Sequence, residues 1–145
     1  MQIRSILVPV DFSDHSGKAL EVAIGLAKQF AGAKVHLLHC YPLNLGGVSP
    51  YGIVIPESFD RECRDAAAKQ LDQWAEKVSS QGVEVSTTVT ARFPSEAIAD
   101  QAGELGVDLI VMGTRGLTGL KHILLGSVAE RTLRVAKCPV LTVKT

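Results

Sequence analysis

The stretch SILVPV, residues 5–10, is almost entirely apolar. A short run of this kind is typical of a strand buried on both faces, as in parallel sheets that are covered by helices. Residues 11–14 then offer side chains that cap a helix, and apolar residues recur at helical spacing over residues 20–30. A second apolar run follows at residues 34–40. The start of the chain therefore predicts a β-α-β unit.

The remainder of the chain continues this alternation of strands and helices. Several prolines and glycines over residues 41–55 predict a loop. The expected helices after the loop are 57–80, 94–105 and 127–136, and the expected strands are 83–89, 107–112 and 139–143. Valines alternate with polar residues in the first of these strands, which indicates the edge of a sheet. Together the pattern predicts one α/β domain over residues 1–145, a doubly wound parallel sheet with helices on both faces.

Charge and cysteine content limit the partners. Lys plus Arg and Asp plus Glu both number 15, so no net field attracts nucleic acid or an anionic membrane. The three cysteines are odd in number and irregularly spaced, which fits a reducing compartment rather than a disulfide framework or a metal-ligand pattern. The apolar run at the start is too short for a signal peptide core or a membrane span. We therefore expect a cytoplasmic protein without a nucleic-acid or membrane partner.

Glycines are concentrated after the fourth expected strand, in GTRGLTGLKHILLGS at residues 113–127. Without a Cβ, their backbone N–H groups can approach a bulky anion closely. Gly126 and Ser127 also stand where the last helix begins, and the unpaired N–H groups of a helix start favour negative charge. Ligands of doubly wound sheets bind beyond the carboxyl ends of strands, where the strand order reverses. The pattern favours a phosphate site between the ends of the first and fourth strands.

Other interpretations of these residues stay open. The glycines could shape turns and nothing more, and Ser127 with Glu130 three residues later fits a capping box that would occupy the hydroxyl. Asp11 could cap the first helix. The charged and titratable residues in or near the glycine-rich stretch could pair with the phosphates, although solvation by water is the favoured interpretation; they are Arg115, Lys121 and His122.

Several motifs, in their order along the chain, resemble the universal stress protein family. The glycine-rich stretch carries G-x-x-G, nine further residues and G-S, at Gly113, Gly116, Gly126 and Ser127. This spacing resembles the nucleotide-binding signature of the ATP-binding members of that family. Other segments resemble the family in the same order, namely ILVPVDFS at 6–13, DLIVMG at 108–113 and CPVLTV at 138–143. The likeness covers nearly the whole chain and is weakest over residues 43–58.

The resemblance implies a five-stranded Rossmann-like sheet in the order 3-2-1-4-5 that binds ATP, with Mg or Mn held through the phosphates. The implied residues are Pro9, Val10, Asp11 and Cys40 beside adenine and ribose, Met112 at the end of the fourth strand, and Gly113, Gly116, Gly126, Ser127 and Val128 beside the phosphates. The carboxylate of Asp11 suits this part because it can accept hydrogen bonds from sugar hydroxyls or an exocyclic amine. Cys40 departs from the aliphatic residue that the family leads us to expect beside the base.

These observations favour an ATP-binding, nucleotide-dependent stress-response protein with at most slow hydrolysis. The chain has no G-x-x-x-x-G-K-[ST] loop, and no nucleophile with an evident base, so we expect no catalytic residues. Two alternatives are an enzyme that transfers phosphoryl or adenylyl groups to a substrate held under residues 41–55, and a nucleotide-free dimerisation module. The last strand is expected at the sheet edge, where it would pair with a second copy in a homodimer. Replacement of Leu141 by proline is then predicted to weaken the dimer.

Overall fold

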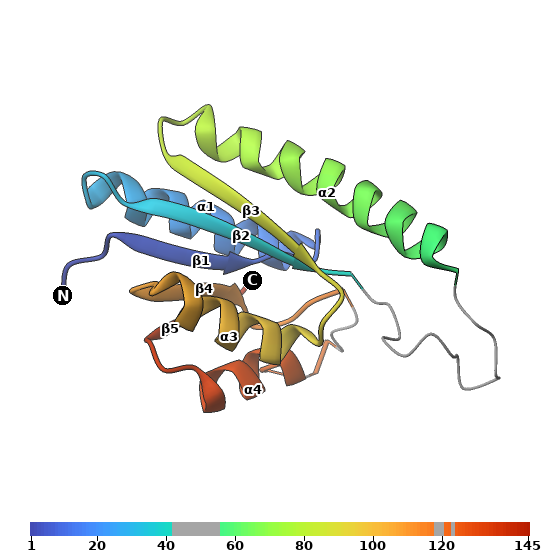
Figure 1. Ribbon diagram of the computed structural model, residues 1–145. Coiled ribbons are helices and arrows are strands. Elements are labelled where there is room, and N and C mark those ends of the chain that lie inside the picture. Colours follow the sequence, from blue (N-terminus) through green and yellow to red (C-terminus); the bar gives the residue numbers. More distant parts are fainter. Residues whose placement is uncertain (42–55, 118–120, 123) are drawn as a thin grey trace.

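Five parallel strands form the centre of the molecule (Figure 1). A computed structural model describes residues 1–41, 56–117, 121–122 and 124–145. The strands are β1 (Ser5–Pro9), β2 (Lys34–Cys40), β3 (Glu84–Thr90), β4 (Leu109–Gly113) and β5 (Val140–Val143). They lie in the order β3-β2-β1-β4-β5, and every neighbouring pair is parallel. The predicted doubly wound sheet, its strand order and the edge position of β3 are therefore confirmed.

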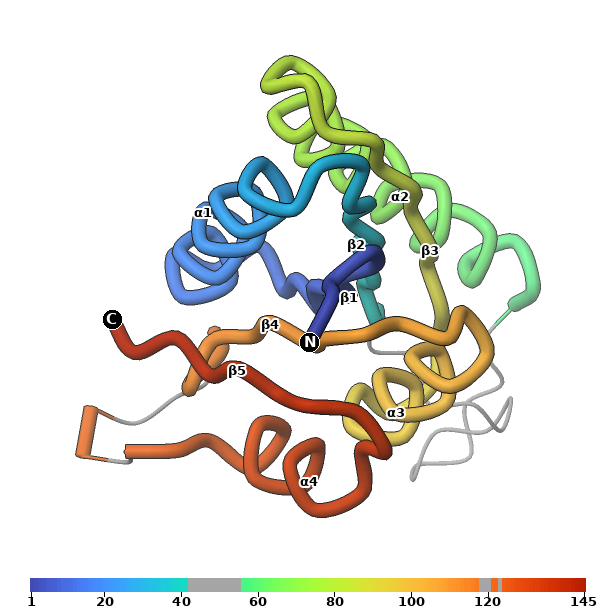
Figure 2. The backbone as a smooth tube through the Cα atoms, turned by 90° about the vertical axis from the view of Figure 1, so that its left-hand side faces the viewer, coloured from blue at the N-terminus to red at the C-terminus, as the bar shows by residue number. Residues whose placement is uncertain are grey.

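Four helices among the described residues cover the two faces of the sheet. They are α1 (Asp14–Gln29), α2 (Glu57–Ser79), α3 (Pro94–Leu105) and α4 (Ser127–Val135). Figure 2 shows α1 and α2 on one side of the strands and α3 and α4 on the other. None of the helices in the described part of the chain is both long and apolar enough to cross a membrane.

The central strand β1 is buried on both faces, as its apolar run predicts. Ile6 and Val8 pack in one hydrophobic cluster with α1 and α2, whereas Leu7 packs in a second cluster with α3 and α4. All three side chains are 0% exposed. Successive side chains of a strand point to opposite faces, so an unbroken apolar run is what a two-sided core requires.

Several boundaries differ from the predicted ones by one or two residues, and hydrogen bonds give the local reason for two of them. β4 begins at Leu109 rather than at residue 107, because the Asp108 carboxylate turns back to accept the backbone N–H groups of Arg4 (2.8 Å) and Ser5 (3.0 Å). β1 ends at Pro9, after which Val10 N–H still donates to the carbonyl of Leu38 at 2.8 Å. Of the predicted loop, residues 42–55 lie outside the described part.

Candidate functional site

The predicted site residues follow strands that meet at one edge of the sheet. Pro9 ends β1 and Gly113 ends β4, and the two strands are direct neighbours through the pairs Ile6–Leu109 and Leu7–Ile110. Cys40 ends β2 on the other side of β1. The carboxyl ends of parallel strands share an edge, so the topology brings these segments to one switch point.

Asp11 connects the two central strand ends. Its Oδ2 accepts the backbone N–H of Leu117 at 2.9 Å, while its Oδ1 accepts the backbone N–H of Ser13 at 3.0 Å and the Ser13 hydroxyl. We call the Asp11–Leu117 hydrogen bond the clasp, because it joins the end of β1 to the loop after β4. Asp11 does not cap α1 itself, since Ser13 is the N-cap residue and its hydroxyl accepts the Ser16 N–H at 3.2 Å.

Gly116 is enclosed by the clasp. A Cβ added at Gly116 would lie 2.4 Å from Asp11 Oδ2, which is closer than any side chain tolerates. The backbone angles do not require glycine there, because the described glycines with positive φ are Gly32, Gly82 and Gly106. Close approach of the carboxylate is thus the reason for this glycine.

The other two glycines of the motif are also held by close contacts. A Cβ at Gly113 would lie 3.1 Å from the carbonyl oxygen of Arg115 and 3.1 Å from His15 Cβ. A Cβ at Gly126 would lie 3.1 Å from the carbonyl oxygen of Thr114, to which Gly126 N–H donates at 2.6 Å. The start of α4 is therefore bonded directly to the loop that follows β4.

The capping box expected at Ser127 and Glu130 is absent from this helix start. The N-cap residue of α4 is Gly126, with φ −71° and ψ 163°, and Ser127 is the first helical residue. The carboxylate of Glu130 instead accepts a hydrogen bond from Arg134 at 2.8 Å. This interpretation was wrong because the helix begins one residue earlier than a capping box at Ser127 requires, so Ser127 lies inside the first turn. Ser127 and Val128 are exposed in the first turn.

An aromatic cluster that the sequence reasoning missed lies directly behind Asp11. Phe12 has φ 64°, an uncommon value for a non-glycine residue, and its ring lies 4.3 Å from that of His39 and 5.5 Å from that of Trp74. Nδ1 of the buried His39 lies 2.7 Å from the Val10 carbonyl oxygen. Ring stacking therefore stabilises the turn that contains Asp11 and Phe12. The residue types around Phe12 do not predict its positive φ.

Cys40 faces the opposite side of the sheet from this aromatic cluster. It packs against the cluster that contains Met112, Leu38 and Ile98. Burial raises the pKa of the Cys40 thiol to about 11, although the positive charge of Arg92 acts in the opposite direction. The thiol is therefore neutral near pH 7, a small apolar group rather than a nucleophile.

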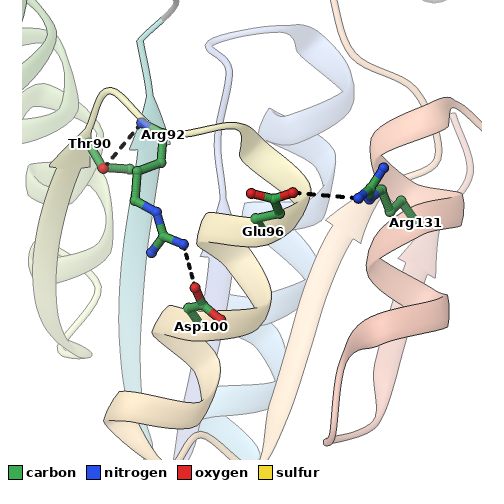
Figure 3. A network of polar contacts seen from close by, with 5 residues as sticks. All are labelled: Thr90, Arg92, Glu96, Asp100 and Arg131. Carbon is green, nitrogen blue, oxygen red and sulfur yellow. Dashed lines mark hydrogen bonds and ion pairs between the residues drawn. The ribbon is translucent and has the colours of Figure 1, made fainter. Parts of the chain in front are cut away.

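Several positive side chains near this edge of the sheet contact protein groups, whereas others are exposed. Arg115 Nη2 donates to the Thr145 carbonyl oxygen at 3.4 Å, and His15 Nδ1 contacts the Thr145 hydroxyl. Figure 3 shows Arg92 paired with Asp100 and Arg131 of α4 paired with Glu96 of α3, the latter at 3.5 Å. Lys121 and His122 are exposed. Across the described ranges, no group of three or more His, Cys, Asp or Glu residues is placed to hold a metal ion.

Sequence comparison places the chain among named relatives over its whole length. The model of the family described as "Universal stress protein family" matches residues 2–144. The universal stress protein YxiE of Bacillus subtilis is 39% identical over 145 residues, which cover 96% of this chain and 97% of YxiE.

Solved structures give the same result for the fold. The structure of MJ0577, a universal stress protein of Methanocaldococcus jannaschii, matches with a TM-score of 0.88 at 29% identity and covers 100% of this chain and 98% of that one. The universal stress protein of Archaeoglobus fulgidus in complex with dAMP matches with a TM-score of 0.68 at 27% identity, over 98% of each chain.

Proposed function

The chain belongs to the universal stress protein family, and from this we propose that it binds ATP at the switch point and acts as a nucleotide-dependent stress-response protein. One observation carries the proposal. The loop after β4 donates its Leu117 N–H to an anionic oxygen, Asp11 Oδ2, at 2.9 Å. A loop whose amide already holds a carboxylate oxygen has the polarity that a phosphate oxygen needs.

The residues present fit a nucleotide in three respects. The Gly113 to Leu117 loop and the start of α4 are joined through Gly126 and supply backbone N–H groups. Asp11 supplies carboxylate oxygens that can accept ribose hydroxyls or an exocyclic amine. Cys40, which is partly exposed at the end of β2, supplies apolar surface for a base, whereas the side chains of Val10 and Met112 are buried in different hydrophobic clusters. The dAMP complex of the Archaeoglobus fulgidus protein supports an adenine nucleotide as the ligand.

The chemistry we propose is binding with at most slow hydrolysis. Three or four charge-assisted N–H bonds, reduced by the entropy lost on binding, correspond to an affinity of about micromolar. A divalent cation, Mg or Mn, would bind through the phosphates and neutralise part of their charge. Ser127, exposed in the first turn of α4, has a hydroxyl that can bond a phosphate oxygen, and Val128 supplies the next backbone N–H.

We further propose a cytoplasmic homodimer formed through β5. This strand lies at the end of the sheet, where unpaired backbone groups can bond a second copy. Leu141 and Leu133 are 39% and 44% exposed, which gives the edge an apolar flank.

Mass spectrometry of small molecules released by heating freshly purified protein tests the proposed ligand. We expect ATP or ADP in an amount close to that of the protein, and calorimetric titration of the emptied protein with ATP and Mg²⁺ should give an affinity of about micromolar. No released nucleotide together with no measurable titration heat would leave the glycines as turn residues of a nucleotide-free dimerisation module. Release of ADP or AMP at many turnovers per minute would favour a phosphoryl- or adenylyl-transferring enzyme.

A further inference from the structure

The clasp places a negative charge inside the loop that is proposed to hold phosphates. Both oxygens of Asp11 are used by the protein, Oδ1 by Ser13 and Oδ2 by Leu117. The missing side chain of Gly116 leaves space that Oδ2 fills, since a Cβ there would lie 2.4 Å away. The carboxylate therefore occupies a position in which the loop amide would otherwise be open to an anion.

Within the described residues, no ion pair compensates the Asp11 carboxylate. The ion pairs in the described part of the chain join Lys18 with Glu21, Lys34 with Glu84, Arg92 with Asp100, Arg131 with Glu96 and Arg134 with Glu130, and none includes Asp11. Burial alone would raise the pKa of Asp11, but hydrogen bonds from Ser13, Leu117 and Ser16 outweigh it and lower the pKa. The group is ionised at neutral pH, so an approaching polyphosphate meets a like charge.

A nucleotide can offer what a bare polyphosphate lacks. Opening the clasp leaves a partly buried carboxylate oxygen without its donor, and this loss is costly unless another donor takes the place of the Leu117 N–H. Sugar hydroxyls are donors of this kind, whereas the oxygens of a fully ionised tripolyphosphate are acceptors only. The freed Leu117 N–H would then be available to a phosphate.

We infer that Asp11 determines specificity: its carboxylate excludes polyphosphates that carry no sugar and gives up the Leu117 amide only to a ligand whose hydroxyls replace it. This inference rests on the proposed nucleotide site and deepens it. Asp11 is then a selective gate as well as a contact. If Asp11 only contacted the sugar, or only supported the structure, its replacement would not strengthen the binding of a polyphosphate that lacks a sugar.

Calorimetric titration with sodium tripolyphosphate and with ATP, both with Mg²⁺, separates these roles. The variants are Asp11→Asn, which removes the charge and keeps the size, and Asp11→Ala, which also removes the clasp. We expect both to bind tripolyphosphate at least about tenfold more tightly than the unmodified protein. In both variants the ratio of ATP affinity to tripolyphosphate affinity should fall by at least a similar factor.

Asp14→Asn is the matched control, because Asp14 is an exposed carboxylate in the first turn of α1 and its replacement removes the same charge. It should leave tripolyphosphate affinity within about twofold. Thermal unfolding of each variant establishes that it is folded, and Asp11→Asn keeps the test open if Asp11→Ala is not.

Each outcome has one meaning. Unchanged or weaker tripolyphosphate binding by folded Asp11→Asn overturns the gate, even if ATP affinity falls, because a pure contact with the sugar gives that result. If the unmodified protein binds no ATP, the proposed function fails. The gate is then decided by the gain in tripolyphosphate binding alone.

Discussion

At the scale of single residues, contacts rather than backbone angles explain the glycines of the site. Gly116 faces Asp11 Oδ2, Gly113 faces His15, and Gly126 faces the Thr114 carbonyl. Each contact brings a segment from elsewhere in the chain against the loop after β4. The glycine pattern therefore reflects how tightly this loop is packed.

Gly116→Val should lower ATP affinity by at least about tenfold, or about 1.4 kcal/mol. The valine side chain would fill the space of the Asp11 carboxylate, which breaks the clasp and blocks the loop amide. Calorimetry measures the change. Gly103→Val is the control, because nothing lies within 4 Å of a Cβ at Gly103 and its affinity should stay within about twofold. Equal affinities for the two variants would mean that the nucleotide binds elsewhere.

Cys40 makes stability sensitive to alkaline pH. Its thiol has an ordinary pKa of 9.0 and one of about 11 in the folded chain. As pH rises, the unfolded chain therefore loses this proton before the folded chain does. The contribution of the Cys40 thiol to stability is complete below pH 9 and is lost as pH rises toward 11. We expect the free energy of unfolding to fall between these pH values by about 2 kcal/mol more in the unmodified protein than in Cys40→Ala.

Urea denaturation at several pH values tests this prediction. Other groups that titrate in the same range, such as Tyr41, are present in both proteins and cancel in the difference. Parallel pH profiles for the two proteins would show that Cys40 ionises as easily in the folded chain as in the unfolded one.

The sequence predicted residue types at the site better than their partners. The motif positions at Gly113, Gly116 and Gly126 identified the loop, but the clasp could not be foreseen, because Asp11 and Leu117 are 106 residues apart. The left-handed Phe12 was equally hidden, since its conformation is supported by stacking on His39. Contacts between distant segments depend on the fold and leave no local pattern.

At the scale of elements, β5 decides how a second copy could pair. The carbonyls of Pro139 and Val143 accept bonds from Ile110 and Thr114 beside β4. Residues of a parallel strand alternate between its two sides, so Leu141 also faces β4, whereas Val140 and Thr142 face the open edge. Proline at Leu141, suggested by the sequence, would thus damage the sheet rather than the dimer edge.

Thr142→Pro is the better test of the proposed dimer. Proline is tolerated at an edge position whose N–H points outward, so the monomer should keep its fold while the pairing of two β5 strands loses a bond. Sedimentation equilibrium should give a dimer dissociation constant at least about tenfold higher for Thr142→Pro than for the control variant Lys144→Ala. Identical sedimentation of a folded Thr142→Pro would place the interface on another surface.

Elements were predicted well because each carries its own signal. The apolar run of β1 and the alternation of β3 gave their places in the sheet, and Pro94 marked the first residue of α3. The start of α4 at Ser127 was predicted correctly, whereas the capping box was not, because Gly126 and Ser127 both suit an N-cap and only the bond from Gly126 to Thr114 decides between them.

At the scale of the whole molecule, a ligand at the switch point should stabilise the entire domain. It would bridge the segments that follow β1 and β4, and these two strands contribute side chains to both hydrophobic clusters. At an ATP concentration of about 100 times the dissociation constant, the free energy of unfolding should rise by about 2.7 kcal/mol. For a chain of this size the melting temperature should rise by about 6–10 °C.

Differential scanning calorimetry with and without ATP and Mg²⁺ measures this rise. At the same ATP concentration Gly116→Val should show at most about half of it, whereas Gly103→Val should show it in full. A full rise in melting temperature for Gly116→Val would show that ATP stabilises the protein without binding at the glycine-rich loop.

The central place of β1 also sets the order in which the molecule can be completed during translation. β1 leaves the ribosome before the other strands of this sheet, and β2 can join it early, but the other side of β1 pairs with β4. A nascent chain therefore carries one open backbone edge until residues 109–113 have been made, and the glycine loop follows at once. Closure of the sheet and assembly of the proposed nucleotide site thus coincide late in synthesis, so ATP bound at this site would not assist the early steps of folding.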